Sequence, residues 1–287
     1  MFTKLLKTKT FDGYPDDFVL ARIRGRGYCT PVSSAGAVTT RKGLDREYSW
    51  IFSLLNKKTT KTFTPFFSLF EVERLLSCLR LDRRGESSQV PQILSDSLLS
   101  RPAGSLIEMV RDPAGKLIGI MDLLEFPSDT RSRMERMLVD ESWTDIEAVF
   151  WETYLKWATG SSRRKDLTFF FQTRVDMRNL LAMHKALRWQ SEKSPPFIDE
   201  GSFPQSSLDR FMKADSLKGL EDFARRRLAQ RASGNLEFDL IHGLAILLHR
   251  RARFAGGGPT MILSHLWNLY AGLRQRASER VSHEEVA

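Results

Sequence analysis

Histidine and cysteine are the residues of this sequence whose spacing could reveal a metal site or a nucleophile. The histidines are His184, His242, His249, His265 and His283. None forms the H-E-x-x-H pattern that brings two zinc ligands onto one helix face, and His242 and His249 would lie two helical turns apart. Cys29 and Cys78 each lack a second cysteine at zinc-ligand spacing. We therefore expect no metal ion and no catalytic thiol, and so few cysteines are typical of a reducing, cytoplasmic setting.

The sequence also lacks the glycine patterns that bind nucleotides. The run closest to G-x-x-x-x-G-K-[ST] is 113–117, PAGKL, which is missing the first glycine and the final hydroxyl. The pair Gly25 and Gly27 is not followed by the third glycine of a dinucleotide-binding turn. We therefore expect no catalytic residues and no cofactor. A helical enzyme whose site is assembled from residues distant in the sequence stays open as an alternative.

Positive charge is the next feature with a chemical meaning. The chain carries a formal net charge of +9 over 287 residues, which invites a nucleic-acid interpretation. Residues 1–61 hold 12 Lys/Arg against 5 Asp/Glu, so +7 of this excess lies there and the other residues are nearly balanced. Such a distribution argues against a long basic groove. An N-terminal region that meets an acidic protein or lipid headgroups explains the same asymmetry.

Arginines gather in four short clusters, and phenylalanine gathers in one. The basic clusters are 22–26, 163–165, 225–227 and 250–253. We interpret each as a solvated helix face, where charged residues usually lie. Phe169, Phe170 and Phe171 could stack on the bases of a single strand, but the amphipathic run that follows them favours core packing. Nucleic acid is therefore not an expected partner, although a basic nucleic-acid-binding protein remains an alternative.

Apolar residues recur with helical spacing along most of the chain, which predicts an all-α fold. The ranges expected to be helical are 18–26, 49–55, 66–81, 92–99, 104–111, 167–189, 206–211, 217–231, 236–254 and 259–280. Residues 117–124 fit a strand or a helix, and residues 30–40 fit a loop. Asp112 to Gly115 indicates a turn, and Thr144 with Glu147 fits a capping box at the start of a helix. Because charges interrupt every run of 18 residues, we expect no membrane span.

Three segments of the sequence align without gaps, which indicates an internal repeat. They are EVERLLSCLR (71–80), DMRNLLAMHK (176–185) and HLWNLYAGLR (265–274). The second, fifth and sixth positions are apolar or aromatic in all three, and a basic residue closes each one. Unrelated amphipathic helices can align in this way, and that alternative stays open. If the repeat is real, it predicts three helical units, at 1–90, 91–195 and 196–287.

The middle segment resembles a repeat of the central-stalk C/d family of the V-type and A-type rotary ATPases. In that family a repeat typically closes with an acidic residue, then Asn-Leu and, shortly after, a basic residue. Residues 174–189, RVDMRNLLAMHKALRW, match this pattern through Asp176, Asn179, Leu180 and Arg188. The match is short, so its weight depends on the order of the other pieces.

Three further segments resemble the family in the expected order. Residues 18–26, FVLARIRGR, are similar to the Asn-Ala-Arg-Val-Arg-like helix that opens its first repeat. Residues 199–211 resemble the turn and short helix that begin its third repeat, and 266–286 resemble its last helix and acidic tail. The chain departs from the pattern at Arg74, which replaces the asparagine, and at His265, which replaces the acid.

The resemblance implies three helical repeats around a pseudo-threefold axis, arranged as a funnel. It also implies a non-catalytic central-stalk subunit, peripheral on the cytoplasmic side of the membrane, that couples the rotor ring to the central shaft in ATP-linked proton or sodium transport. Its partners would be the proteins of the ring and the shaft, so membrane contact would be indirect. The exposed basic residues expected to bind these partners are Arg22, Arg24, Arg80, Lys185, Arg188 and Arg274. A helical-repeat adaptor that binds another protein is the main alternative.

Overall fold

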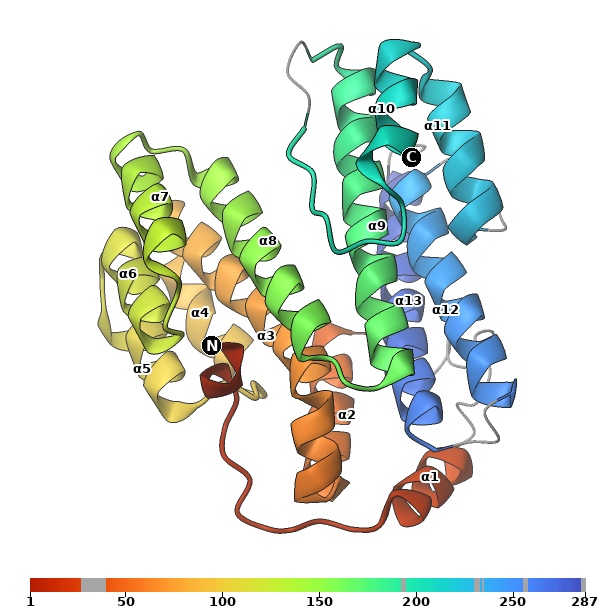
Figure 1. Ribbon diagram of the computed structural model, residues 1–287. Coiled ribbons are helices and arrows are strands. Elements are labelled where there is room, and N and C mark those ends of the chain that lie inside the picture. Colours follow the sequence, from red (N-terminus) through yellow and green to blue (C-terminus); the bar gives the residue numbers. More distant parts are fainter. Residues whose placement is uncertain (27–39, 192–194, 230–232, 234, 255–257, 285–287) are drawn as a thin grey trace. The chain divides into compact units, whose positions relative to one another are not determined.

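The computed structural model describes residues 1–26, 40–191, 195–229, 233, 235–254 and 258–284 (Figure 1). Every regular element in these ranges is a helix, which confirms the all-α prediction. Across the same ranges, no helix has the combination of length and apolar composition that crossing a bilayer requires. Cys29 and nearly all of the loop predicted at 30–40 lie outside the described residues.

The chain folds into two compact units. The first unit contains Met1–Gly13 and Tyr48–Leu167, and the second contains Tyr14–Glu47 and Thr168–Ala287. These bounds differ from those of the three predicted repeats, which stay a prediction.

The first unit is built around one long helix, α3 (Lys57–Arg83). The side chain of Asn56 caps this helix by accepting a hydrogen bond from the Thr59 N–H at 2.7 Å. Around it lie the end of α2 (Arg41–Leu54), η3 (Ser87–Gln89), α4 (Val90–Leu94), α5 (Arg101–Met109), α6 (Pro113–Leu123), α7 (Ser128–Val139) and α8 (Trp143–Ser161). Pro65 lies inside α3, and its carbonyl accepts a hydrogen bond from the Tyr154 hydroxyl of α8. A long helix with an internal proline is therefore tied to its neighbour at that residue.

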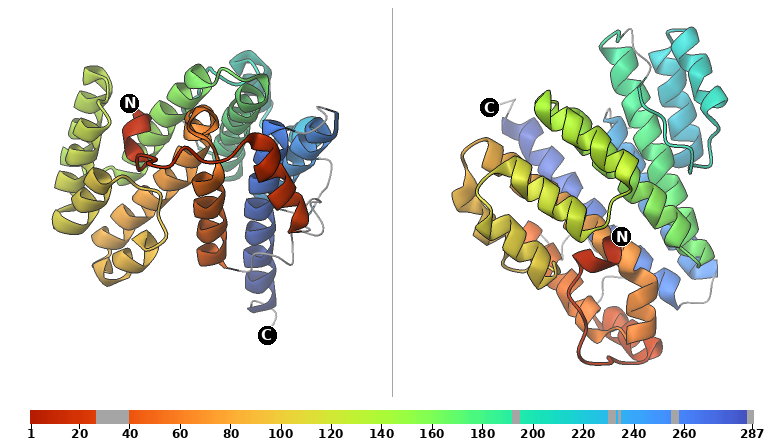
Figure 2. Two further views of the ribbon diagram at one scale, coloured as in Figure 1. Left: turned by 90° about the horizontal axis from the view of Figure 1, so that it is seen from below. Right: turned by 60° about the vertical axis from the view of Figure 1, so that its left-hand side comes forward.

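The N-terminal 3-10 helix η1 (Phe2–Leu5) packs against α3 in this unit (Figure 2). The Phe2 side chain is fully buried. Its ring centroid lies 5.2 Å from those of Tyr154 and Trp157 and 5.8 Å from that of Phe150. Such edge and tilted aromatic contacts add to the free energy gained by burial. The first turn of the chain is thus part of the core of this unit.

The second unit is organised around the hairpin of α12 (Leu236–Phe254) and α13 (Pro259–Glu284), which lie side by side (Figure 1). With them lie the first part of α2, α1 (Asp16–Gly25), α9 (Lys165–Arg188), α10 (Gln205–Lys213), α11 (Leu217–Ala224) and a π-helical turn, η4 (Arg225–Ala229). Trp267 of α13 is fully buried and donates its indole N–H to the Ile241 carbonyl at 3.1 Å. Phe170 makes a T-shaped contact with this indole and is itself fully buried, which confirms the core role predicted for it.

Two local predictions were wrong, because the residues involved are compatible with more than one local structure. The predicted turn at Asp112 to Gly115 is the start of α6, where the Asp112 side chain accepts a hydrogen bond from the Gly115 N–H at 2.8 Å. Asp-Pro suits an N-cap and first helical turn as well as a loop. Thr144 is not a cap, because α8 begins at Trp143 after Ser142 and makes no side-chain capping bond.

Helix α7 was missed altogether, and α3 begins at Lys57 rather than Phe66. The first half of α7, residues 128–133, contains no apolar residue, so the apolar spacing is confined to its second half, where Met134 is buried. The start of α3 is rich in threonine and lysine and precedes Pro65, and both features weaken a helical signal. In both cases the contacts made in the folded unit decide the structure.

Replacing Phe2 with alanine should lower the free energy of unfolding by about 3–5 kcal/mol, because it opens a cavity in the aromatic cluster. Phe11→Ala is the matched control, since Phe11 is 57% exposed and its loss should cost less than about 0.5 kcal/mol. Chemical denaturation of both variants measures the difference. Equal, small losses would show that η1 does not belong to the core.

Candidate functional site

The three aligned segments lie on the three longest helices, α3, α9 and α13, and their polar positions are buried. The first position holds Glu71, Asp176 and His265, and the fourth holds Arg74, Asn179 and Asn268, all at most 3% exposed. The closing residues Arg80, Lys185 and Arg274 are exposed. Because buried polar groups must find partners, the first and fourth positions show what each helix holds.

In the first unit, Glu71 holds the chain that leads into α5. Its Oε1 atom accepts a hydrogen bond from the Leu98 N–H at 3.0 Å, and the two residues are 27 positions apart. The other carboxylate oxygen, Oε2, lies 3.6 Å from Arg74 Nε on the same helix. Arg74, which replaces the asparagine of the family pattern, therefore compensates the buried charge of Glu71.

In the second unit, Asp176 holds the chain that leads into α10. Its Oδ1 atom accepts hydrogen bonds from the Ser202 N–H at 2.9 Å and the Phe203 N–H at 3.0 Å, and its Oδ2 atom accepts one from the Ser202 hydroxyl. Burial raises the pKa of this carboxyl above its ordinary value, and the three hydrogen bonds oppose the rise. A Cβ on Gly201 would lie 2.3 Å from Asp176 Oδ1, so only glycine allows this close approach.

Asn179 extends the same contact by one helical turn. Its side-chain amide donates to the Ile198 carbonyl at 2.9 Å and accepts from the Ile198 N–H at 3.1 Å. The acid and the asparagine of the second segment therefore bind backbone groups of residues 198–203.

The two repeated carboxylates thus make the same kind of contact, which we call the carboxylate latch. Glu71 and Asp176 each lie on a long helix and accept backbone N–H groups 26 or 27 residues further along the chain. In both cases the bound residues end just before the next helix, at Arg101 or Gln205. The first two aligned segments therefore share a structural role as well as a pattern.

The third segment makes a different contact, because histidine replaces the acid. His265 Nε2 lies 3.6 Å from Glu47 Oε1, and the other oxygen of Glu47 accepts a hydrogen bond from Arg26. Glu47 is 7% exposed and comes from the first part of α2. The carboxylate at this position of the second unit is thus supplied by another helix.

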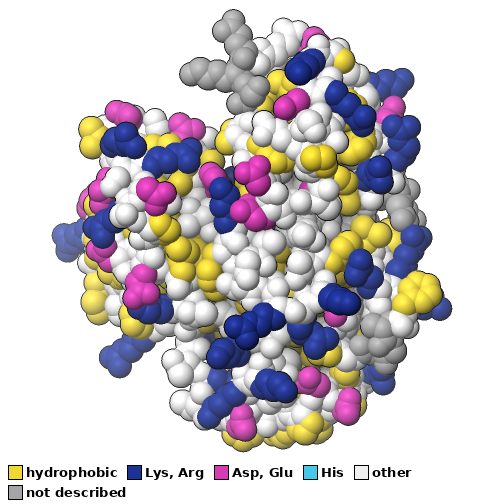
Figure 3. Space-filling model, in the orientation of Figure 1, with side chains coloured by type: hydrophobic (Ala, Val, Ile, Leu, Met, Phe, Trp, Pro, Cys, Tyr) yellow, Lys and Arg dark blue, Asp and Glu magenta, His cyan; other side chains and the backbone are white. Residues whose placement is uncertain are grey.

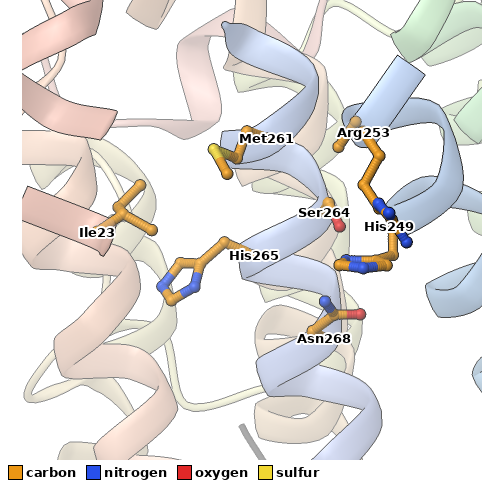
Figure 4. A pocket seen from close by; sticks show the side chains of 8 residues that line it. Ile23, His249, Arg253, Met261, Ser264, His265 and Asn268 are labelled. Atoms are coloured by element: carbon orange, nitrogen blue, oxygen red, sulfur yellow. The ribbon is translucent and has the colours of Figure 1, made fainter. Parts of the chain in front are cut away.

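A small pocket lies next to His265, between α1, α12 and α13 of the second unit (Figure 4). Its volume is about 50 Å³, and its lining residues are Ile23, His249, Ala252, Arg253, Met261, Ser264, His265 and Asn268. Figure 4 shows His249, Ser264 and Asn268 gathered on one side, while His265 points toward Ile23. Burial, and secondarily the charge of Arg253, lower the pKa of His249, so its ring is neutral at neutral pH.

The six basic residues expected to bind partners have different surroundings in the structure. Arg80 forms a bidentate ion pair with Glu147, with distances of 2.7 and 2.9 Å. Arg274 pairs with Glu237 at 2.7 Å. Both guanidinium groups are therefore already engaged within their own unit.

The other four, Arg22, Arg24, Lys185 and Arg188, are exposed and make no ion pair with any residue that the structure describes. Arg22 lies over the ring of Phe18 at 5.6 Å, and this ring stacks on Tyr14. Lys185 and Arg188 lie in the last turn of α9. On the face drawn in Figure 3, lysine and arginine side chains are interspersed with acidic and apolar ones.

A buried ion pair in the first unit was not foreseen from the sequence. Lys116 Nζ lies 2.5 Å from Asp82 Oδ2, with both side chains at most 5% exposed.

Burial, followed by the charge of Asp82, raises the pKa of the nearby Cys78 thiol to about 12, so this thiol stays protonated at neutral pH. Across the described ranges, no group of three or more His, Cys, Asp or Glu side chains could hold a metal ion.

Comparison with known proteins adds no relative to this description. No protein-family model, curated protein or solved structure matches the chain. The functional argument therefore depends on the residues and contacts described above.

Replacing Asp176 with alanine should free residues 202 and 203 from α9. The loss of charge-assisted hydrogen bonds to buried N–H groups should lower the free energy of unfolding by about 2–3 kcal/mol. Amide hydrogen exchange should also become faster at Ser202 and Phe203. Asp199→Ala is the control, because Asp199 is exposed in the same stretch. If both variants exchanged alike, Asp176 would not be holding this stretch.

Replacing Lys116 with methionine should leave the Asp82 charge buried without its partner, at a cost of about 3–5 kcal/mol in unfolding free energy. The double variant Lys116→Met with Asp82→Leu should recover most of that loss, because no buried charge remains. Lys58→Met, at an exposed position, is the control in the same denaturation series. A double variant no more stable than the single one would contradict this assignment.

Proposed function

We propose that this chain is a non-catalytic coupling component of a V-type or A-type rotary ATPase, which joins the membrane rotor ring to the central shaft. In this role it would lie peripherally on the cytoplasmic side of the membrane, in a complex that links ATP to proton or sodium transport. The finer arrangement, three repeats forming a funnel around a pseudo-threefold axis, is part of the same proposal.

The observation that carries the proposal is the carboxylate latch. Asp176 and Asn179 are the residues through which the second segment resembles the family pattern, and both hold the chain that leads into the next helix. Glu71 does the same in the first unit. The pattern is therefore associated with the same tertiary contact in two of the three aligned segments, which supports a true repeat over a chance alignment of amphipathic helices.

The latch also suits the mechanical task. A protein that transmits torque must keep the segments between its helices fixed, because movement of those segments would absorb part of the rotation. A buried carboxylate that accepts backbone N–H groups fixes such a connection, since releasing it would leave a buried charge without partners. The internal contacts therefore support a role as a stiff link.

The basic residues expected to bind partners differ in how available they are. Arg22 and Arg24 on α1 and Lys185 and Arg188 on α9 are available for carboxylates of a partner, and charge-assisted contacts of this kind orient partners during association. Arg80 and Arg274 would first have to give up Glu147 and Glu237. We therefore rank the first four above these two as binding residues.

The decisive experiment is a pull-down of the tagged chain from its own membranes at moderate salt, followed by mass spectrometry. The expected result is co-purification of a small apolar ring protein with proteins of the shaft and the ATPase head. Recovery of nucleic acid would contradict the proposal and favour a nucleic-acid-binding protein, and recovery of an unrelated soluble protein alone would favour the adaptor.

Charge reversal sharpens this experiment. Arg22→Glu with Arg24→Glu should reduce recovery of the ring or shaft proteins by about tenfold or more, because attraction at the interface becomes repulsion. Lys57→Glu with Lys58→Glu changes the charge equally at exposed positions outside the predicted set and should leave recovery unchanged. Equal recovery with both double variants would remove α1 from the interface.

A further inference from the structure

The pocket of the second unit has a polar side that no described residue completes. Asn268 is 3% exposed, and its side-chain carbonyl oxygen accepts no hydrogen bond from any residue that the structure describes. A buried acceptor without a donor costs roughly 1–3 kcal/mol. Since Asn268 lines the pocket, a ligand or water inside it would have to donate a proton to this oxygen.

The other groups on this side favour a negative charge in the ligand. Arg253 brings a permanent positive charge, and the neutral His249 ring and the Ser264 hydroxyl can each donate a hydrogen bond. None of the eight lining residues, all of them in described ranges, is an aspartate or glutamate. The carboxylate that contacts His265 is Glu47, which also pairs with Arg26, and His265 points away from His249 in Figure 4.

Size restricts the ligand further. A single water needs about 10–15 Å³ measured in this way, so a pocket of about 50 Å³ has room for about four water-sized groups. One tetrahedral oxyanion is of this size. Ile23, Ala252 and Met261 line the remaining walls with apolar groups, and the volume is too small for a nucleoside or a sugar to enter whole.

We propose that this pocket binds a single phosphoryl group that carries a proton, independently of the coupling role. Arg253 supplies the charge, and His249, Ser264 and the Asn268 amide donate to the phosphoryl oxygens. The P–O–H group donates to the Asn268 carbonyl. Inorganic phosphate keeps a proton at neutral pH, whereas sulfate has none, so the buried acceptor should discriminate between two anions of the same shape.

The test is isothermal titration calorimetry of the full chain at constant ionic strength with phosphate, sulfate and methyl phosphate. We expect saturable binding of phosphate and at least about tenfold weaker binding of sulfate, the difference that one buried unpaired acceptor produces. The methyl phosphate titration is run at about pH 5.5, where a monoester also keeps a proton because its second pKa is about 6, and binding tighter than that of phosphate at the same pH would identify a monoester as the source of the group. Phosphate and sulfate bound equally, or no saturable heat from any of the anions, would overturn the proposal.

Two matched variants locate the site. Arg253→Gln should weaken phosphate binding by about tenfold or more, because it removes a charge-assisted contact. Arg250→Gln removes the same charge from the same end of α12, but Arg250 does not line the pocket, so binding should change less than about twofold. Equal losses in the two variants would mean that the anion binds the basic helix end in general, which would also overturn the proposal.

Discussion

The burial of a carboxylate in the middle of a long helix is the constraint on which much of this structure depends. Asp176 is fully buried and Glu71 is 2% exposed, and neither could stay ionised there without donors. The chain approaching the next helix has N–H groups that no helix satisfies. When the carboxylate accepts these N–H groups, both the buried charge and the N–H groups gain partners. The contact also determines where that chain lies. A packing contact between apolar side chains would tolerate a shift of one residue, whereas the directed hydrogen bonds that Glu71 and Asp176 accept do not.

The second unit shows what happens when the acid is missing. His265 occupies the corresponding place on α13, and the carboxylate is supplied by Glu47, whose other oxygen binds Arg26. With histidine on α13, the buried carboxylate at this position comes from a different helix, α2. The change also leaves Asn268 without the backbone partners that Asn179 has. The pocket thus lies where the third segment departs from the repeated pattern, and Asn268, at the position of Asn179, lines its polar side.

The sequence predicts the helices that carry an apolar stripe and fails where another interaction decides. Helix α12 has the predicted bounds, Leu236–Phe254, because its apolar spacing is regular and a glycine run follows it. The start of α6 was taken for a turn, because Asp112 and Pro113 suit both structures, and α7 was missed because its first half contains no apolar residue. The repeat located the polar positions of the candidate site. It could not identify their partners, which lie 26 or 27 residues away in segments with no periodic pattern.

The buried polar contacts are better understood as determinants of one arrangement than as sources of stability. Replacing a buried ion pair such as Lys116 and Asp82 with apolar residues is often neutral or stabilising. What such a pair does supply is a large penalty for any alternative packing that separates the charges. A protein that transmits torque needs this penalty more than it needs a high unfolding free energy, because a body with two packings of similar energy would switch between them under load. A role that depends on one fixed arrangement needs no catalytic pocket. The phosphoryl site is therefore independent of the proposed role, and the two are tested separately.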